Sequence, residues 1–317
     1  MVMRFERLDL NLLVALDALL AECNVSAAGE RLCLSQSAMS GTLNRLRDYF
    51  GDELLVSAGR HLVPTARARA LVAPVREVLH QIKTTIATPP DFDAATCERD
   101  LTIMASDYVL TVLLAEALQV IAAAAPGLTF TVLPLDDKPQ AQLERGRVDL
   151  LIGQEAAASE NHPATLLFED EYVVVGCAGN PRLRRPIDAE RYYAMGHVVT
   201  EIGATRQPAF DERVLRQDAR KRRVEVVAPS FAAVPALVVG TDRIATVQRR
   251  LAEQQARHLP LRILPLPVAL PSLRLVAQWH KAGAQDAALR WVVDRVKAQA
   301  QALAPRDNAS RVVQAAE

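Results

Sequence analysis

The chain has 317 residues, half of them hydrophobic, which predicts at least two separately folded globular units and excludes a disordered chain. Basic and acidic residues are equal at 37 each, so the net charge is zero and any nucleic-acid contact must depend on a local basic surface. The longest apolar runs are shorter than the roughly 18 residues of a membrane span, and no signal peptide is recognisable, which favours a cytoplasmic protein without a membrane partner.

The first 65 residues contain the pattern of three helices followed by a hairpin, which is the outline of a winged helix-turn-helix domain. Asp9 can cap a first helix whose leucines recur at helical spacing, and a second short helix begins after Asn24 or Ser26. Ser35 is a good N-cap for a third helix that runs to about Phe50. A β-like stretch bracketed by glycine and proline follows, which predicts a hairpin, or wing, with its tip at residues 57–61.

The third helix has one apolar face and one face rich in Ser, Gln, Asn and Arg, on which Asp48 is the only acid. Every amphipathic helix has a polar face, but a solvated one is more often rich in Glu and Lys, whereas these residue types bind base edges and phosphates. Between Arg31 and Arg76, seven arginines stand against three acids, which gives a local positive charge. We therefore predict contacts to base edges from Gln36, Ser37, Ser40 and Asn44, and contacts mainly to phosphates from Arg45, Arg47, Arg60 and Arg67.

Two positions in this region have two equally good explanations. At the wing tip, Arg60 can enter a minor groove, where the potential is most negative, or can simply be solvated. Inside the third helix, Gly41 can admit a close approach of the DNA backbone or can merely be tolerated.

A fourth helical stretch carries an apolar stripe with helical spacing, formed by Leu71, Val75, Val78, Ile82 and Ile86. A single helix cannot bury such a stripe alone, which predicts a homo-oligomer built on this helix. The alternative is that the stripe packs against its own N-terminal domain. Pro74 removes a backbone donor within the run, so we expect a kink or a break near Ala70 and Leu71.

Beyond the Thr88-Pro89-Pro90-Asp91 breaker, short β runs alternate with helical segments, which indicates an α/β fold with parallel strand pairing. The strands are expected at residues 101–105, 129–133, 149–152, 172–177, 197–200, 224–227, 244–247, 262–266 and 273–278. The clearest helices are expected at 109–124, 140–145, 231–239, 249–255 and 286–298. So many strands are wide for one sheet, which favours two smaller α/β lobes with a cleft between them.

The predicted domains are a winged helix-turn-helix over residues 1–65, a linker and dimerisation helix over 66–90, a two-lobed effector-binding domain over 91–303 and a flexible tail over 304–317. In doubly wound sheets, ligands gather beyond the carboxyl ends of strands. We therefore expect the ligand near Ser106, Asp107, Gln154, Glu201 and Gly203. Ser230 and Phe231 open a helix whose backbone donors could hold an anionic group, while the Phe231 ring could stack on the ligand.

Several segments together closely resemble the DNA-binding domain of LysR-type transcriptional regulators: residues 8–13, 34–40, 50–55 and 59–65. Residues 195–198, 222–231 and 240–246 look like the branch that contains the flavonoid-responsive nodulation regulators and the regulators of aromatic-compound degradation. The resemblance therefore covers nearly the whole chain.

This resemblance implies a winged helix-turn-helix, a dimerising linker helix and a two-lobed effector domain like a periplasmic binding protein. It also implies homodimers or homotetramers on double-stranded operator DNA, RNA polymerase as a partner, and a small, partly aromatic, acidic or phenolic effector. His197 is similar in position to the histidine that contacts the acidic group of the ligand in aromatic-responsive relatives, although a histidine that begins a strand can also be purely structural.

Two residues depart from the family pattern. Ser37 stands where the family usually has proline, and it adds a hydroxyl where a DNA contact is expected. Ser230 stands where salicylate-type regulators tend to have histidine, which weighs against a salicylate-like effector.

Two alternatives belong to other functional classes, and a third is a regulator that binds no ligand. An enzyme is disfavoured because no recognised catalytic motif is present and the six histidines are scattered. A solute-binding transport protein would share the two lobes but would need an export signal and would lack the helical N-terminal domain. A DNA-binding regulator with a ligand-independent C-terminal domain stays open. The four cysteines are too far apart for a zinc site, and we expect neither a metal nor a cofactor.

Overall fold

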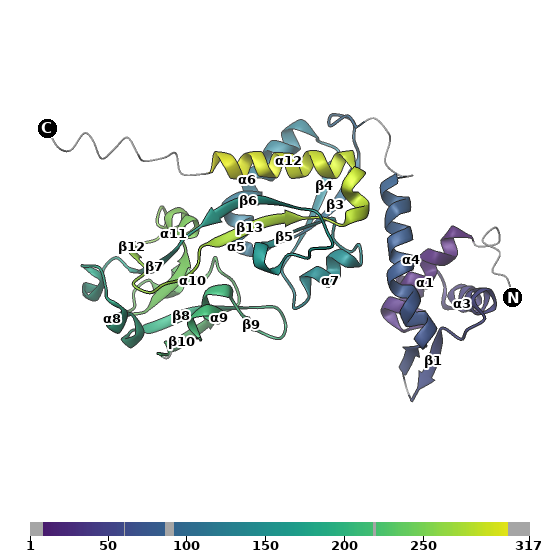
Figure 1. Cartoon of the computed structure of the whole chain (residues 1–317), viewed down its shortest axis with the longest axis horizontal. Helices are drawn as coiled ribbons and strands as arrows, with labels where there is room; N and C mark the ends of the chain where they lie inside the picture. Colours follow the sequence, from purple (N-terminus) through teal and green to yellow (C-terminus); the bar gives the residue numbers. More distant parts are fainter. Residues whose placement is uncertain (1–8, 60, 86–91, 218–219, 304–317) are drawn as a thin grey trace. The chain divides into compact units, whose positions relative to one another are not determined.

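The computed structural model describes residues 9–59, 61–85, 92–217 and 220–303 (Figure 1). Its contacts divide the chain into two compact units: an N-terminal unit of Met1–Pro90, with which Glu144–Gly146 is grouped, and a C-terminal unit of Asp91–Leu143 and Arg147–Glu317. Arg60 of the predicted wing tip, Ile86 of the predicted stripe and the predicted tail, residues 304–317, lie outside the described residues.

The described part of the N-terminal unit contains the predicted helices and hairpin. They are α1 (Leu10–Glu22), α2 (Val25–Arg31), α3 (Gln36–Phe50), β1 (Leu55–Ala58), β2 (His61–Pro64) and α4 (Ala66–Thr85). The side chains of Asp9, Asn24 and Ser35 each accept a hydrogen bond from a backbone N–H in the first turn of the following helix. The predicted caps are confirmed, and Asn24 is the residue that starts the second helix.

The core of this unit comes from the apolar faces of α1 and α3. Met39, Leu43, Leu46 and Phe50 of α3 are buried against the leucines of α1. The strands β1 and β2 pair in antiparallel fashion from Leu55 opposite Pro64 to Ala58 opposite His61. The predicted wing is therefore confirmed.

Helix α4 continues through Pro74, so of the expected kink or break near Ala70 and Leu71 the break is wrong, and the kink stays a prediction. Helix α4 packs against α1 along this stretch. Val75 is buried in the core of the N-terminal unit, and the Arg76 guanidinium lies 2.5 Å from the Asp17 carboxylate of α1. Part of the predicted oligomer stripe is thus used inside the unit, whereas Val78 is 41% exposed.

The C-terminal unit is built on two sheets (Figure 1). The first has the order β4-β3-β5-β13-β6, with β3 (Arg99–Met104), β4 (Leu128–Leu133), β5 (Leu150–Gln154), β6 (Ala164–Asp170) and β13 (Leu273–Gln278). The second has the order β10-β8-β11-β7-β12, with β7 (Tyr172–Cys177), β8 (Gly196–Ile202), β10 (Arg223–Ala228), β11 (Ile244–Gln248) and β12 (Leu261–Pro265). The short strand β9 (Gln207–Pro208) pairs with β8. The predicted two-lobed architecture is confirmed, and the two sheets are called lobe 1 and lobe 2 below.

Both sheets are mixed rather than parallel, which corrects the prediction from strand and helix alternation. Strand β13 runs antiparallel to β5 and β6, and β7 runs antiparallel to β11 and β12. The reason is that β6 leads directly into β7 of the other lobe and β12 leads back into β13, without the intervening helix that a parallel connection needs. These direct connections join the lobes at Glu171 and at residues 266–272.

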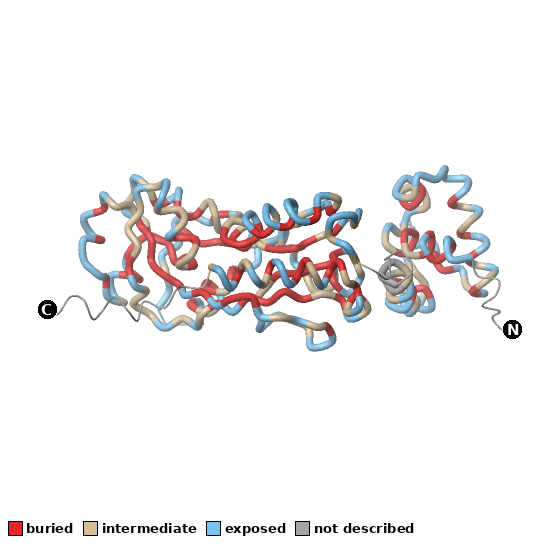
Figure 2. Tube along the Cα trace, turned by 90° about the horizontal axis from the view of Figure 1, so that it is seen from above, coloured by how far each residue is buried: buried red, intermediate tan, exposed pale blue. Residues whose placement is uncertain are grey.

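The helices of the C-terminal unit cover the sheets. They include α5 (Asp107–Val109), the π-helical turn η2 (Leu110–Leu114), α6 (Ala115–Ala124), α7 (Pro139–Glu144), α8 (Ala189–Ala194), α9 (Phe210–Leu215), α10 (Val234–Val238), α11 (Arg249–Gln255) and α12 (Ala287–Ala302). Figure 2 shows the buried residues along the strands and along one side of these helices. Sequence reasoning missed β6, β9, α8 and α9.

One helical stretch, Asp107–Ala124, is long and apolar enough to cross a membrane by length and composition alone. In the structure, Leu113, Leu114 and Ile121 of this stretch are fully buried in the core of lobe 1. The stretch is therefore the core helix of a globular unit.

Candidate DNA-binding surface and ligand pocket

Helix α3 presents a polar face that is free of contacts with the rest of its unit over most of its length. Gln36, Ser37, Asn44 and Arg45 are exposed, and Ser40 is half-buried. No described atom lies within 4 Å of the position that a Cβ atom would occupy on Gly41. The structure thus places the four predicted base-contacting residues on one accessible side of one helix.

The guanidinium of Arg47, one of the predicted phosphate contacts, is used within the unit. Its Nε donates to the backbone oxygen of Glu53 at 2.9 Å, and Nη2 donates to the backbone oxygen of Leu55 at 3.1 Å. Nε also lies 3.2 Å from the Glu53 carboxylate. Arg47 therefore fastens α3 to the start of the wing, a role that its position on a helical wheel did not reveal. Arg67 is exposed and contributes to the positive charge near Asp52.

Gly29 is a residue of this domain that sequence reasoning missed. A Cβ atom there would lie 2.9 Å from the backbone oxygen of Leu34, across the turn that joins α2 to α3. The backbone N–H of Leu34 donates to the Gly29 oxygen at 2.8 Å. A glycine is thus needed for the close approach of the two helices, and a glycine within a polar helix was the available signal.

A small cavity of about 40 Å³ lies between the lobes of the C-terminal unit. Strands contribute most of its wall, because β3, β5, β8 and β11 all end beside it. Its aromatic lining residues are Tyr108, Tyr172, Phe210 and Phe231. Its polar lining residues include Ser106, Gln154 and Gln248, and the remaining wall is mainly aliphatic.

Three of the predicted effector residues, Ser106, Gln154 and Phe231, line this cavity. Asp107 lies next to it and joins the lobes, since its carboxylate accepts hydrogen bonds from the backbone N–H groups of Phe231 at 3.2 Å and Ala232 at 2.7 Å. These are the donors that we expected to hold an anionic group of the ligand. That expectation is wrong for this structure, because the protein's own carboxylate occupies them.

The remaining predicted effector residues are not among the described residues that line the cavity. The Ser230 hydroxyl accepts a hydrogen bond from the backbone N–H of Ala233 at 3.2 Å. Glu201 lies 2.9 Å from Arg206 and 3.7 Å from Arg216 in ion pairs. Gly203 has a φ of +76° and approaches Asp137 too closely for a side chain, so its role is conformational.

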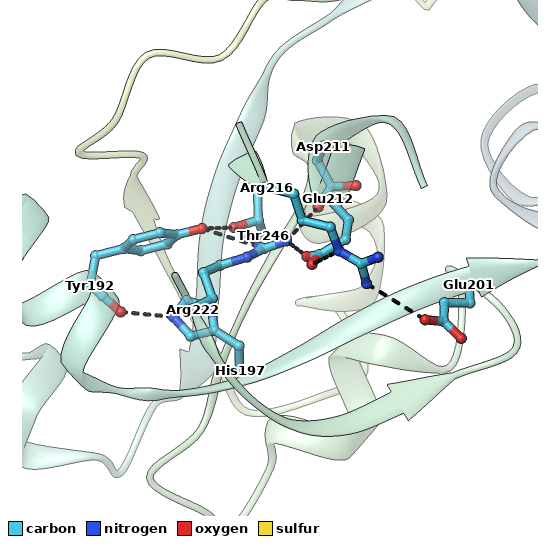
Figure 3. A network of polar contacts seen from close by, with 8 residues as sticks. All are labelled: Tyr192, His197, Glu201, Asp211, Glu212, Arg216, Arg222 and Thr246. Carbon is cyan, nitrogen blue, oxygen red and sulfur yellow. Dashed lines mark hydrogen bonds and ion pairs between the residues drawn. The ribbon is translucent and has the colours of Figure 1, made fainter. Parts of the chain in front are cut away.

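His197 is fully buried inside lobe 2 (Figure 3). Its Nε2 donates to the backbone oxygen of Tyr192 at 2.7 Å, while Nδ1 is buried and has no hydrogen-bond partner among the described residues. Burial and the nearby Arg222 and Arg223 lower the pKa of His197 to about 4, so the ring is neutral at pH 7. His197 begins β8, whereas the cavity lies at the far end of that strand, beside Ile202.

A buried polar network surrounds Arg222 in the same lobe (Figure 3). Its side chain is 3% exposed, is 3.6 Å from the Asp211 carboxylate and is also paired with Glu212. Its Nη1 donates to the Tyr192 hydroxyl at 3.2 Å. Burial raises the pKa of Asp211 to about 6 despite the opposing charge of Arg222. Both acids belong to α9, so the network fixes the helix that places Phe210 in the cavity.

The tyrosines of the cavity wall are tied to polar groups. Tyr108 donates from its hydroxyl to the Asp170 carboxylate at 2.5 Å, and its ring meets Phe231 edge to face with centroids 6.4 Å apart. Tyr172 lies opposite Gln248 in the antiparallel pairing of β7 with β11, and the interaction with Gln248 lowers the pKa of Tyr172 against the larger effect of burial. Sequence reasoning missed Tyr108, Tyr172, Phe210 and Gln248; the strand ends next to Tyr172 and Gln248 were the available signal.

Comparisons with known proteins cover both units. Residues 10–69 match the family described as bacterial regulatory helix-turn-helix protein, lysR family, and residues 96–301 match the LysR substrate binding domain. The chain is 43% identical over 292 residues to Nodulation protein D 3 of Rhizobium leguminosarum bv. phaseoli, which covers 92% of this chain and 97% of that protein. It is 42% identical over 307 residues to Nodulation protein D 2 of Sinorhizobium fredii, which covers 96% of this chain and 98% of that protein.

Solved structures share the fold. A probable transcriptional regulator from Pseudomonas aeruginosa is 30% identical with a TM-score of 0.62, which covers 92% of this chain and 97% of that chain. Full-length CbnR complexed with its target DNA is 15% identical with a TM-score of 0.51, which covers 92% of this chain and 100% of that chain.

Proposed function

The chain belongs to the LysR family of DNA-binding transcriptional regulators, which are not enzymes, and we propose that it binds operator DNA through α3 and responds to a small aromatic molecule bound between its lobes. The observation that carries the ligand proposal is the cavity at the strand ends, which is lined by four aromatic rings and a few polar groups. Such a lining is typical of small-molecule sites. The nodulation proteins to which the chain is similar suggest flavonoid-like probes.

For the DNA contact, we propose that Gln36, Ser37, Ser40 and Asn44 reach base edges in the major groove. Arg45, Arg60 and Arg67 would contact phosphates and fix the orientation of the helix. Arg47 would act mainly by holding the wing, because its guanidinium donates to the backbone of Glu53 and Leu55. The fold is shared with CbnR, which has been solved in complex with its target DNA.

For the ligand, the size of the cavity implies a conformational change. A cavity of about 40 Å³ holds only about three water molecules, whereas benzene needs a cavity of about 150 Å³. An aromatic ligand would therefore enter only when the lobes separate or the rings move. Binding would then favour a more open C-terminal unit, and this differential affinity is what a regulator needs to transmit a signal.

We further propose a homodimer or homotetramer that uses the exposed part of α4. Val78 of α4 is 41% exposed, and Val14 of α1 is also 41% exposed, so both leave apolar surface outside the core of their unit. Paired subunits would place two recognition helices on a palindromic site. With these assignments, residues 1–65 form the DNA-binding domain, 66–90 the linker and 91–303 the effector domain of a cytoplasmic regulator that acts through RNA polymerase.

The test of the ligand proposal is a thermal-shift screen of flavonoids, benzoates and salicylates, followed by calorimetry on any compound that binds. Phe231→Ala should weaken a hit about tenfold or more, because the ring forms part of the cavity wall. Phe92→Ala is the matched control, since its ring packs on Trp291 instead. Equal binding by the wild type and Phe231→Ala would place the ligand elsewhere. A screen without a single shift would favour the alternative, a regulator with a ligand-independent C-terminal domain.

A further inference from the structure

Gln248 carries an unused hydrogen-bond acceptor at the wall of the cavity. It is the last residue of β11 and is 2% exposed. It lies opposite Tyr172 in the pairing of β11 with β7, while its Oε1 is buried and has no hydrogen-bond partner among the described residues. A buried acceptor without a donor costs free energy, which a ligand that brings a donor would recover.

The charges around the cavity disfavour an anionic ligand. None of the described residues that line it is lysine, arginine or histidine. Arg213 at the rim is exposed and donates to Oε1 of Gln154 at 3.4 Å. The backbone donors of Phe231 and Ala232 already bind the Asp107 carboxylate. A ligand carboxylate inside the cavity would therefore lose its hydration without gaining a counter-ion from the described lining residues.

The tyrosine beside Gln248 gives the same indication. Burial, followed by the charges of Asp211 and Asp170, raises the pKa of Tyr172 well above its usual value, although Arg213 opposes this effect. These surroundings would likewise disfavour the ionised form of a phenol group of the ligand that lies in a similar position. The wall thus accepts a neutral aromatic group with a proton to donate.

We propose that Gln248 is the specificity-determining residue of this cavity, and that it selects an uncharged aromatic ligand whose hydroxyl donates to Oε1. This inference rests on the proposed function, since it assumes that an effector binds between the lobes. Loss of the hydroxyl would leave Oε1 unpaired in the complex, and a site built for a donor rejects an analogue that lacks it.

The experiment is calorimetry with matched probes on the full-length protein. The probes are the singly hydroxylated flavones, the methyl ether of each, and the flavone carboxylates. In the wild type, at least one hydroxyflavone should bind about tenfold or more tightly than its methyl ether, and the carboxylates should bind more weakly than both. Gln248→Leu should remove the preference for the hydroxyl over the ether.

Gln140→Leu is the matched control, because Oε1 of Gln140 is also buried without a partner but Gln140 does not line the cavity. It should keep the preference. If hydroxyflavones and their ethers bind the wild type equally, if carboxylates bind best, or if the preference survives in Gln248→Leu, this inference is overturned while the ligand site stands. If no probe binds the wild type, flavones are not its ligands, and the inference is overturned together with the ligand class that we propose.

Discussion

The buried imidazole of His197 makes the stability of the C-terminal unit depend on pH. The ring is fully buried, and no described residue forms a hydrogen bond with its Nδ1. Burial, together with the charges of Arg222 and Arg223, lowers the pKa to about 4 from an unfolded value of about 6.5, although the Tyr192 backbone and Glu225 oppose the shift. The unfolded chain therefore binds this proton more readily than the folded chain. The contribution of His197 is fully present above pH 6.5 and is lost as the pH falls towards 4.

The size of the effect follows from the shift. A difference of about 2.5 pKa units corresponds to about 3 kcal/mol as an upper limit. Asp211 acts in the opposite direction, because its folded pKa is raised to about 6, so its contribution is present below pH 3.8 and is lost as the pH rises through 6. The contributions of His197 and Asp211 to the pH dependence of the free energy of unfolding thus nearly cancel between pH 4 and 6 in the wild type.

Urea unfolding at pH 4.5, 5.5 and 6.5 separates the two residues. Both tryptophans of the chain, Trp279 and Trp291, belong to the C-terminal unit, so intrinsic fluorescence reports on that unit alone. Relative to the wild type, His197→Gln should become less stable as the pH rises, whereas Asp211→Asn should become more stable. Because the variants are compared with the wild type at equal pH, the titrations of other groups cancel. Identical pH slopes in the wild type and His197→Gln would refute the reasoning.

Three further predictions concern DNA binding, the wing and the closed lobes. Asn44→Ala should cost about 1 to 3 kcal/mol of binding free energy at one operator position, whereas Arg45→Ala should weaken binding to all sequences and reduce the slope of log affinity against log salt concentration by about one. Fluorescence anisotropy on a selected operator measures both effects, and an unchanged base preference in Asn44→Ala would show that the DNA-binding face is misassigned. Arg47→Met should speed amide exchange in β1 and β2 by about tenfold, since two hydrogen bonds to the backbone disappear; unaltered exchange would contradict the role of Arg47 as a wing fastener. Asp107→Asn should weaken the contact between the lobes and raise ligand affinity severalfold by calorimetry, and a lower affinity would mean that the ligand binds the closed form.

The N-terminal unit was largely predictable from the sequence because its structure is local. Caps such as Asp9 and Ser35 act within one helical turn, and the apolar side of α3 follows from helical spacing. The sequence did not predict the contact of Arg47 with the backbone of Glu53 and Leu55, because this contact depends on how the wing folds back on the helix.

The cavity was predictable only in part, because its wall combines residues that are distant in sequence. The rule that ligands gather beyond strand ends identified Ser106 and Gln154. It could not identify Tyr172, which joins the wall through antiparallel pairing with the last residue of β11. The family resemblance suggested His197, but His197 begins β8 and lies at the opposite end of that strand from the cavity. Helix α9, which brings Phe210, is too short and too acidic to stand out in the sequence.

Hydrogen exchange with and without the hydroxyflavone that binds most tightly tests the ligand site most directly. We predict that added ligand alters exchange at the strand ends around the cavity, residues 106–108, 152–154 and 246–248, and at residues 230–232, where the lobes meet. Exchange around His197 in β8 should stay unchanged, because that residue lies in the interior of lobe 2 away from the cavity. Exchange that changes around His197 and not at these strand ends would contradict the account.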